Sequence, residues 1–361
     1  MAQGMNSQQP VFRLEGVSKS YGSVTALRDI TLSVNGNEYI SVLGPSGSGK
    51  SVLLRVIAGF DVPDSGRVVL EGRDITDVPA HERGIGFVFQ NFALFPHLTV
   101  FENVAFGLRN GKVPVAAPDV EQRVKDMISL VGLAGMEGRG VHQISGGQKQ
   151  RVALARTLVM APRLVLLDEP LGALDANLRH RMRNELRAIR EKLGVTFMHV
   201  TGSETEALAM GDRVVVLDHG RIAQFARPDQ VYGQPASPSV AHFLNRYNIF
   251  EGELSGKRFT GPFGMIDAAS VTPADKPACA IRYDRMKVEE EGTPGEGPAI
   301  SASFVASEYL GSSVMYFFEA ADGRVIEVEH HLSLGQPQSF EPKRRYRLRW
   351  KPEDAIVFGR G

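Results

Sequence analysis

The sequence predicts an α/β fold over its first part and a smaller all-β domain over the rest. Two aliphatic runs, 39–43 and 164–167, predict buried parallel strands, and the first run ends in a glycine-rich loop that opens a helix. After about residue 240, helical patterns give way to short alternating segments between loops rich in Gly and Pro. We therefore expect an α/β domain at residues 1–240 and a sandwich- or barrel-like β domain at residues 241–361.

The composition is that of an ordinary globular protein, because 43% of the 361 residues are hydrophobic and 23% are charged. Lys plus Arg equals Asp plus Glu at 41 each, so no nucleic-acid partner is expected. The lone Cys279 can form neither an internal disulfide nor a cysteine-based zinc site. Residues 1–10 do not resemble a secretory signal, and no apolar run approaches the roughly 20 residues that span a bilayer. A membrane role would therefore need a partner.

Periodicity and end signals place the other elements of the first domain. Apolar residues recur at helical spacing over 119–131, Gly59 is a stop signal for the helix after the glycine-rich loop, and Pro162 ends a later helix. The predicted strands are 11–14, 30–34, 39–43, 164–167 and 195–201, and the predicted helices are 50–58, 119–131, 148–160 and 176–193.

The C-terminal β domain is predicted from alternating segments at 279–282, 314–319, 325–328 and 345–350. In the last segment three arginines alternate with large apolar residues; the arginines are Arg345, Arg347 and Arg349. We expect these arginines to form a solvated strand face, with nucleic-acid binding as a distant alternative.

A complete phosphate-loop pattern, G-x-x-x-x-G-K-[ST], follows the first aliphatic run: Gly44, Pro45, Ser46, Gly47, Ser48, Gly49, Lys50 and Ser51. Glycines let the backbone curl so that its N–H groups point at a phosphate chain, and the helix that begins there adds its positive dipole end. We expect Lys50 to reach the β- and γ-phosphates of ATP and the Ser51 hydroxyl to ligate Mg²⁺. An ordinary glycine-rich turn is the alternative, which the flanking strand and helix disfavour.

The second aliphatic run ends in two carboxylates, Asp168 and Glu169. At the end of a central strand near the phosphate loop, Asp168 is expected to hold Mg²⁺ through water. Glu169 is then placed to polarise the attacking water as a general base. Many strands end in solvated acids, so only the pairing with the phosphate loop makes this prediction strong. Together the two motifs indicate a P-loop NTPase.

The segment 144–148 narrows the class of NTPase. After Ile144 it reads Ser145, Gly146, Gly147 and Gln148 at the start of a predicted helix, where a Ser and two glycines make a second anion site. The segment resembles the L-S-G-G-Q signature of the ATP-binding-cassette (ABC) ATPase family. This resemblance implies that the segment binds the γ-phosphate of ATP held by the other subunit of a homodimer. A helix cap by Ser145 is the plainer interpretation, and the two are compatible.

Further marks of the family follow in order, and the resemblance covers about residues 11–240. Tyr21 matches the aromatic residue that stacks on adenine, although a lone Tyr is more often a packing residue. Gln90 matches the glutamine that senses Mg²⁺ and links to the membrane subunit. Asp175 ends the segment that crosses the dimer interface. The resemblance also implies a helical subdomain at about 91–163.

One position departs from the family pattern. The family has a histidine after the third strand that clamps the γ-phosphate, and here Gly202 and Ser203 follow Thr201. His199 lies on the strand about 10 Å earlier, at about 3.3 Å per residue, and on its opposite face, so we expect a core or edge histidine. Because removing a hydrogen bond to transition-state charge costs on the order of 10²–10³ in rate, hydrolysis is expected to be slow or to depend on Ser203 or Glu204.

The chain resembles, within this family, the ATPases of bacterial importers for polyamines, iron(III), sulfate and sugars. Residues 91–100 match the importer segment that helps to accept a coupling helix of the permease, and 280–284, 309–312 and 350–354 match the accessory OB-like (TOBE-like) domain. Tyr283 departs from that domain's usual Pro. The resemblance implies a subunit on the cytoplasmic side of the inner membrane that works with permease subunits and, indirectly, a solute-binding protein. A polyamine-like solute is the nearest match.

Two other functions remain open from the sequence. A non-transport ABC ATPase of translation or DNA repair usually carries tandem cassettes or long coiled-coil insertions, and this chain has neither. A regulatory subunit that binds ATP and hardly hydrolyses it is compatible with Gly202 and disfavoured by Glu169.

Overall fold

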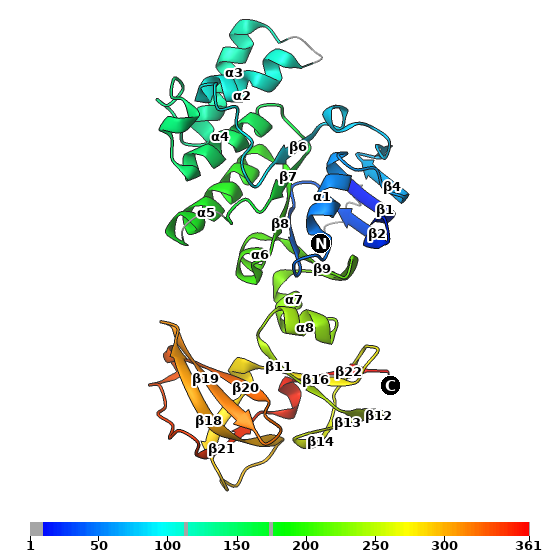
Figure 1. The fold of residues 1–361 in the computed structure, drawn as a ribbon, viewed down its shortest axis with the longest axis vertical. Coiled ribbons are helices and arrows are strands. Elements are labelled where there is room, and N and C mark those ends of the chain that lie inside the picture. The colour runs from blue at the N-terminus through cyan, green and yellow to red at the C-terminus, as the bar shows by residue number, and fades with distance from the viewer. Residues whose placement is uncertain (1–9, 112–114, 173–175, 361) are drawn as a thin grey trace, which may run out of the picture. The chain divides into compact units, whose positions relative to one another are not determined.

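The structure is a computed structural model that describes residues 10–111, 115–172 and 176–360 (Figure 1). The chain divides into two compact units, residues 1–229 and residues 230–361. The predicted boundary at residue 240 lies inside helix α8 (Pro238–Phe243), which packs on strands of the second unit. Each unit has its own hydrophobic core. In the described part of the chain, no helix has the length and apolar character needed to cross a membrane.

A six-stranded, mainly parallel sheet forms the centre of the first unit. Only the edge strand β10 runs antiparallel to its neighbour, and the predicted strands 39–43, 164–167 and 195–201 are confirmed within it. Since β8 lies between β3 and β7, the carboxyl ends of these three strands share one edge. In spatial order the strands are β10 (Arg221–Ala226), β9 (Arg213–Asp218), β3 (Tyr39–Leu43), β8 (Thr196–Thr201), β7 (Leu164–Asp168) and β6 (Ile85–Val88).

Helices cover both faces of this sheet, as Figure 1 shows. Alternate residues of β7 contribute to two different cores: Leu164 and Leu166 pack with α1, and Val165 and Leu167 pack with α2 to α5. This two-sided burial explains why the strands are continuous aliphatic runs. The helices are α1 (Lys50–Ala58), α2 (Val100–Asn110), α3 (Ala117–Leu130), α4 (Gly146–Leu158), α5 (Ala176–Leu193) and α6 (Glu204–Met210).

A second, antiparallel sheet packs on the α1 side. Its strands are β2 (Val24–Val34), β1 (Phe12–Tyr21), β4 (Ser65–Leu70) and β5 (Arg73–Asp74). The predicted strands 11–14 and 30–34 are parts of β1 and β2, which continue into a hairpin. Register shifts after Leu14 break the alternation of polar and apolar residues, so the sequence pattern predicts only the regular parts.

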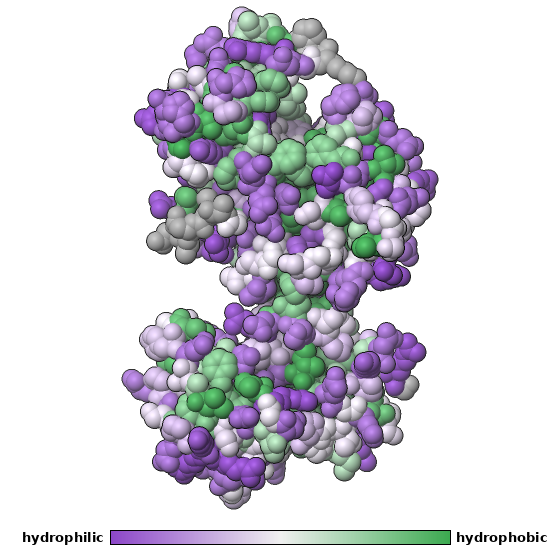
Figure 2. Space-filling view, in the orientation of Figure 1, coloured by the Kyte–Doolittle hydropathy of each residue, from purple (hydrophilic) through white to green (hydrophobic). Residues whose placement is uncertain are grey.

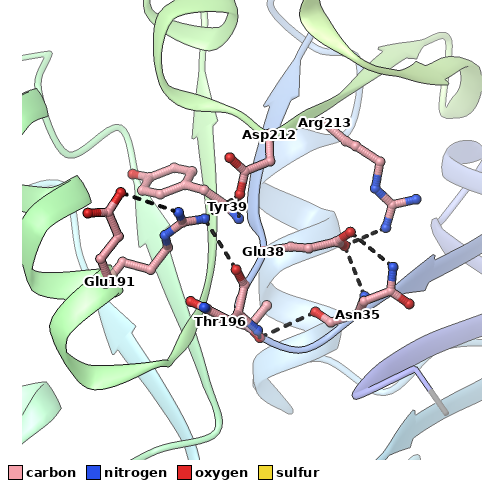
Figure 3. Close-up of polar contacts among 9 residues, drawn as sticks. Asn35, Glu38, Tyr39, Glu191, Thr196, Asp212 and Arg213 are labelled. Atoms are coloured by element: carbon pink, nitrogen blue, oxygen red, sulfur yellow. Dashed lines mark hydrogen bonds and ion pairs between the residues drawn. The ribbon is translucent and has the colours of Figure 1, made fainter. Parts of the chain in front are cut away.

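The amino ends of the parallel strands are held together by a polar network (Figure 3). Glu38 accepts hydrogen bonds from the Asn35 side chain and from Arg213, and the Asp212 carboxylate accepts one from the backbone N–H of Tyr39. Arg190 of α5 also binds Asp212. These contacts join β3, β9 and α5 at the edge of the sheet opposite to the phosphate loop.

The second unit is built mainly from short strands, as predicted. Helices α7 (Pro228–Gly233) and α8 lie at the junction and at the start of this unit. Its sheets are β11 (Tyr247–Glu251), β16 (Ala278–Arg282), β22 (Ala355–Gly359) and β15 (Val271–Pro273); β12 (Glu253–Ser255), β13 (Arg258–Gly261) and β14 (Gly264–Asp267); and β17 (Lys287–Glu290), β21 (Arg345–Arg349), β18 (Ala299–Tyr309), β19 (Ser313–Ala320) and β20 (Val325–His331). One-turn 3₁₀ helices lie at Ala80–Glu82, Val141–Gln143, Tyr283–Arg285, Leu332–Leu334 and Pro352–Asp354.

The prediction of a solvated arginine face on β21 is wrong for Arg349. Arg345 is exposed and Arg347 half-buried, but Arg349 is only 9% exposed. Its Nε donates to Glu289 Oε2 at 2.8 Å, and its Nη1 donates to the carbonyl oxygen of Gly295 at 2.8 Å. The loop after β17 folds over this end of the strand, so the guanidinium has a structural role.

Hydrophilic and hydrophobic residues are interspersed on the surface in view (Figure 2).

Candidate functional site

The phosphate loop connects β3 to α1, and its glycines are required by the backbone path. A Cβ on Gly44 would lie 2.2 Å from the carbonyl oxygen of Leu217, and a Cβ on Gly49 would lie 2.4 Å from that of Ala26. Gly49 has a φ of 101° and Gly47 a φ of 79°, conformations that favour glycine. Pro45, Ser46 and Gly47 are exposed. No side chain caps α1, so the N–H groups of its first turn are available to an anion.

Lys50 folds back over the loop. Its Nζ donates to the carbonyl oxygens of Gly44 at 2.7 Å and Pro45 at 2.9 Å. Burial lowers the pKa of Lys50, and the charges of Glu169 and Asp168 oppose that shift. The buried hydroxyl of Ser48 has no hydrogen-bond partner among the described residues. A buried ammonium beside an unpaired hydroxyl and free helix N–H groups is suited to a phosphate chain.

Two carboxylates stand at the end of β7, as predicted. Burial and the neighbouring charge of Glu169 raise the pKa of Asp168, while Arg55 and Lys50 act in the opposite direction. Glu169 has a φ of 43°, an unusual conformation for a non-glycine residue, and its N–H donates to the carbonyl oxygen of Val200 at 3.2 Å. Strained backbone of this kind is common at functional sites.

Gln90 and Glu169 are brought together although they are far apart in the chain. Gln90 Nε2 donates to Glu169 Oε2 at 3.1 Å. This bond uses the amide nitrogen of Gln90, so its amide oxygen can serve as a ligand. Gln90, Asp168 and Ser51 offer an amide oxygen, a carboxylate and a hydroxyl. This oxygen-only set fits Mg²⁺, and the raised pKa of Asp168 is consistent with a carboxylate pair that a cation would stabilise.

Tyr21 lies at the end of β1 and is 46% exposed, so it is not a packing residue. Its hydroxyl donates to Asp61 Oδ2 at 2.7 Å. Lys19 Nζ lies 5.5 Å from the centroid of the ring. An exposed aromatic ring at the end of strand β1 is available to stack on a nucleobase.

The signature segment caps α4. Ser145 Oγ accepts a hydrogen bond from the N–H of Gln148, and the Gln148 side chain accepts one from the N–H of Ser145. A Cβ on Gly147 would lie 2.9 Å from Leu178, whereas a Cβ on Gly146 would meet nothing within 4 Å. Among the described residues, no hydrogen bond or ion pair joins this segment to the phosphate loop of its own chain. Asp175 lies outside the described residues.

His199 is a core histidine, as predicted. It is fully buried, its ring packs edge-on against Tyr39 with centroids 5.3 Å apart, and burial lowers its pKa to about 3. Position 202 has room for a side chain, because a Cβ on Gly202 would meet nothing within 4 Å. The Ser203 hydroxyl accepts from the N–H of Glu206 and caps α6.

Sequence reasoning missed two carboxylates near the site, Asp61 and Glu206. Asp61 holds the Tyr21 hydroxyl. Glu206 lies buried in the first turn of α6, with its Oε1 3.6 Å from His199 Nε2. Burial raises the pKa of Glu206. Neither belongs to a local motif, so only a signal linking distant positions could have found them.

Comparisons with known proteins agree with this geometry. A family model described as "ABC transporter" matches residues 27–172, and one described as "TOBE domain" matches residues 279–358. The ATP-binding cassette MJ0796, solved as a dimer in a post-hydrolysis state with ADP and Pi, is 31% identical with a TM-score of 0.54 and covers 60% of this chain and 98% of its own. The cbiO1 protein from Clostridium perfringens is 28% identical with a TM-score of 0.58 and covers 66% and 95%.

Curated relatives extend the match to nearly the whole chain. The spermidine/putrescine import ATP-binding protein PotA of Rubrobacter xylanophilus is 40% identical over 358 residues, which cover 96% of this chain and 93% of that protein. The protein of the same name from Vibrio vulnificus is 39% identical over 341 residues, covering 92% and 90%. The chain therefore belongs to the family of ABC transporter ATP-binding proteins that carry a C-terminal TOBE domain.

Proposed function

We propose that this chain binds and hydrolyses ATP to energise an ABC importer, and that its solute is a polyamine. The observation that carries the proposal is the hydrogen bond of 3.1 Å between Gln90 and Glu169. This bond lies beside Asp168. The charges of Asp168 and Glu169 both raise the pKa of the Lys50 ammonium, so the three groups interact. The names of the relatives, spermidine/putrescine import ATP-binding proteins, support the choice of solute.

The residues around the phosphate loop divide the work of hydrolysis. Lys50 would exchange its hydrogen bonds with the loop carbonyls for bonds to the β- and γ-phosphates, and Ser51, Asp168 and Gln90 would hold Mg²⁺. Bound Mg²⁺ would neutralise charge that develops on the phosphates. Glu169, oriented by Gln90, accepts a proton from the attacking water.

The signature segment supports a homodimer. Ser145 and Gly146 are exposed at the positive end of α4 and form no hydrogen bond or ion pair with the phosphate loop of their own chain among the described residues. Because this anion site is not joined to the phosphate loop of its own chain, it suits the γ-phosphate of an ATP molecule held by a second copy. Asp175 would act in the same interface. The dimeric MJ0796 cassette supports this arrangement.

An exposed aromatic cluster supports contact with permease subunits. Phe60 is 41% and Phe89 37% exposed, their rings stack with centroids 5.8 Å apart, and Phe87 lies 4.5 Å from Phe89. Solvent-exposed aromatic side chains of this kind are typical of protein interfaces. Since Gln90 follows Phe89, motion of a bound permease helix would reach Glu169 directly. The subunit would work on the cytoplasmic face of the inner membrane and serve a solute-binding protein only through the permease.

A second function, a regulatory subunit with little turnover, is favoured by one observation, the absence of a side chain at Gly202. It would bind ATP through the same phosphate loop and close the dimer without rapid hydrolysis. The missing histidine at position 202 thus predicts slow hydrolysis of ATP, whereas the complete Glu169–Gln90 pair predicts rapid hydrolysis.

Turnover of Mg²⁺-ATP by the purified protein, with and without its permease, tests the proposal. Glu169→Gln is expected to lower kcat at least about 100-fold because the general base is lost. ATP binding should persist in this variant. Equal turnover in both proteins would contradict the assignment of Glu169, and absent turnover with ATP still bound would favour the regulatory subunit. Co-purification with ribosomes or DNA in place of a permease would contradict transport.

A further inference from the structure

Two side chains from separate segments converge on the carboxylate of Asp61. Asp61 Oδ2 accepts hydrogen bonds from the Tyr21 hydroxyl at 2.7 Å and from Arg55 Nε at 2.7 Å, and Arg55 Nη2 lies 3.3 Å from Oδ1. Tyr21 ends β1, Arg55 lies on α1, and Asp61 follows α1. The Asp61 side chain is only 16% exposed, so solvent competes little for these bonds.

The charge of Asp61 is held fixed by these contacts. Its hydrogen bond with Arg55 is the main cause that lowers the pKa of the Asp61 carboxyl, and the Tyr21 hydroxyl lowers it further. Asp61 is therefore ionised at neutral pH and accepts a charge-assisted hydrogen bond from the phenol. Burial and the adjacent carboxylate raise the pKa of Tyr21, so the phenol stays protonated and remains a donor.

The Tyr21 ring itself has little else to hold it. It is 46% exposed, and Lys19 Nζ lies over the ring, 5.5 Å from its centroid. Lys19 is in turn paired with Asp64 at 3.0 Å. With the hydroxyl tethered at one end and an ammonium over one face, a flat ligand would approach the other face.

We propose that Asp61 is a positioning residue for purine binding, which holds the Tyr21 ring through its hydroxyl in the orientation that stacks on the adenine of ATP. This inference rests on the proposed function, in which Tyr21 is the adenine-stacking residue. A free surface tyrosine would have to give up its rotational freedom when the base binds, and a tethered ring has already done so. Preorganisation of one side chain is expected to improve affinity about three- to tenfold.

A double-mutant cycle on ATP affinity tests the tether. Tyr21→Phe keeps the ring and removes the hydroxyl, while Asp61→Asn keeps the shape of the acceptor and removes its charge. Each change is expected to weaken ATP binding about three- to tenfold. The double variant should bind ATP no more weakly than the weaker single variant, because both changes act on the same hydrogen bond. In turnover assays the KM for ATP should rise by more than kcat falls.

Inorganic tripolyphosphate, which has no base, separates positioning from damage to the site. Its Mg²⁺-dependent binding should be the same in Tyr21→Phe, Asp61→Asn and the unmodified protein, since the phosphate loop is untouched. Parallel losses for tripolyphosphate and ATP would mean that the site is distorted and would overturn the proposal.

Asp64→Asn is the matched control. Asp64 holds Lys19 and the N–H of Ser20 on the same strand but does not contact Tyr21. It should retain the ATP affinity of the unmodified protein; a loss equal to that of Asp61→Asn would overturn the tether.

Tyr21→Ala distinguishes failure of this inference from failure of the proposed site. If Tyr21→Ala weakens ATP binding but Tyr21→Phe does not, the stacking role of Tyr21 is supported and the positioning role of Asp61 is contradicted. If Tyr21→Ala has no effect on ATP binding, the adenine does not bind at Tyr21, and the positioning role of Asp61 is contradicted as well.

Discussion

Gly202 is the position at which a single substitution is expected to raise the rate of hydrolysis. The family resemblance places a γ-phosphate clamp at this position, and the site is open, because a Cβ there would meet nothing within 4 Å. We expect Gly202→His to raise kcat for ATP hydrolysis at least about tenfold, as a new donor would meet transition-state charge. Steady-state phosphate release at saturating Mg²⁺-ATP measures this.

Gly202→Ala is the control for this change, since it alters the backbone preference of the position without adding a donor. Its kcat should stay within about twofold of the starting protein. If Gly202→His shows no gain over Gly202→Ala, the missing histidine does not limit hydrolysis.

His199 gives the core a defined pH response. Its pKa is about 3 in the folded protein against 6.5 when exposed, because burial disfavours the charged ring. Between these values the unfolded chain binds a proton that the folded chain does not. Stability is therefore retained above pH 6.5 and falls as the pH decreases, by about 2 kcal/mol between pH 6.5 and pH 5.

The variant His199→Phe isolates this contribution. It keeps a buried ring against Tyr39 and removes the titrating group. Urea unfolding at pH 6.5 and pH 5 should show a smaller loss of the free energy of unfolding for the variant, with every carboxylate except Glu206, which lies 3.6 Å from His199 Nε2, contributing equally to both proteins. Identical losses would show that His199 is accessible to protons when folded.

At the scale of elements, two capping boxes allow structure and function to be separated. Thr99 and Glu102 cap α2 in the same way as Ser145 and Gln148 cap α4. Thr99→Ala and Ser145→Ala should each lower the free energy of unfolding by about 1 kcal/mol. Only Ser145→Ala should also lower ATP turnover, because only that cap also serves as the proposed anion site. Equal turnover in the two variants would reduce Ser145 to a cap.

The helices and buried strands were predictable because one physical pattern determines each. Gly59 ends α1 with a φ of 83°, as the sequence indicates, and the aliphatic runs become strands buried on both faces. The helix expected from residue 148 begins at Gly146, since its cap is Ser145. The face of β21 was mispredicted at Arg349, because period-2 alternation cannot anticipate a loop that folds over one end of a strand.

At the scale of the whole molecule, the sequence predicted the site motif by motif but not its connections. The phosphate loop and the acids of β7 carry their own local patterns. The bond from Gln90 to Glu169 and the bond from Tyr21 to Asp61 join residues 79 and 40 positions apart. Such pairs depend on strand order, which a single sequence does not contain.

ATP-dependent association of two chains is the prediction that involves the whole molecule. Glu169→Gln should bind ATP without hydrolysing it, so Mg²⁺-ATP should convert the variant to a species of twice the mass that retains ATP in sedimentation and gel filtration. Adding Gly146→Asp should abolish this, because a carboxylate would repel the γ-phosphate of the second copy, while the open space at that Cβ spares the fold. Gly36→Asp, equally open but at the other edge of the sheet, should leave association intact. Dimers with trapped ATP in the Gly146→Asp background would mean that the signature segment does not face a nucleotide, and the sandwich would have to be abandoned.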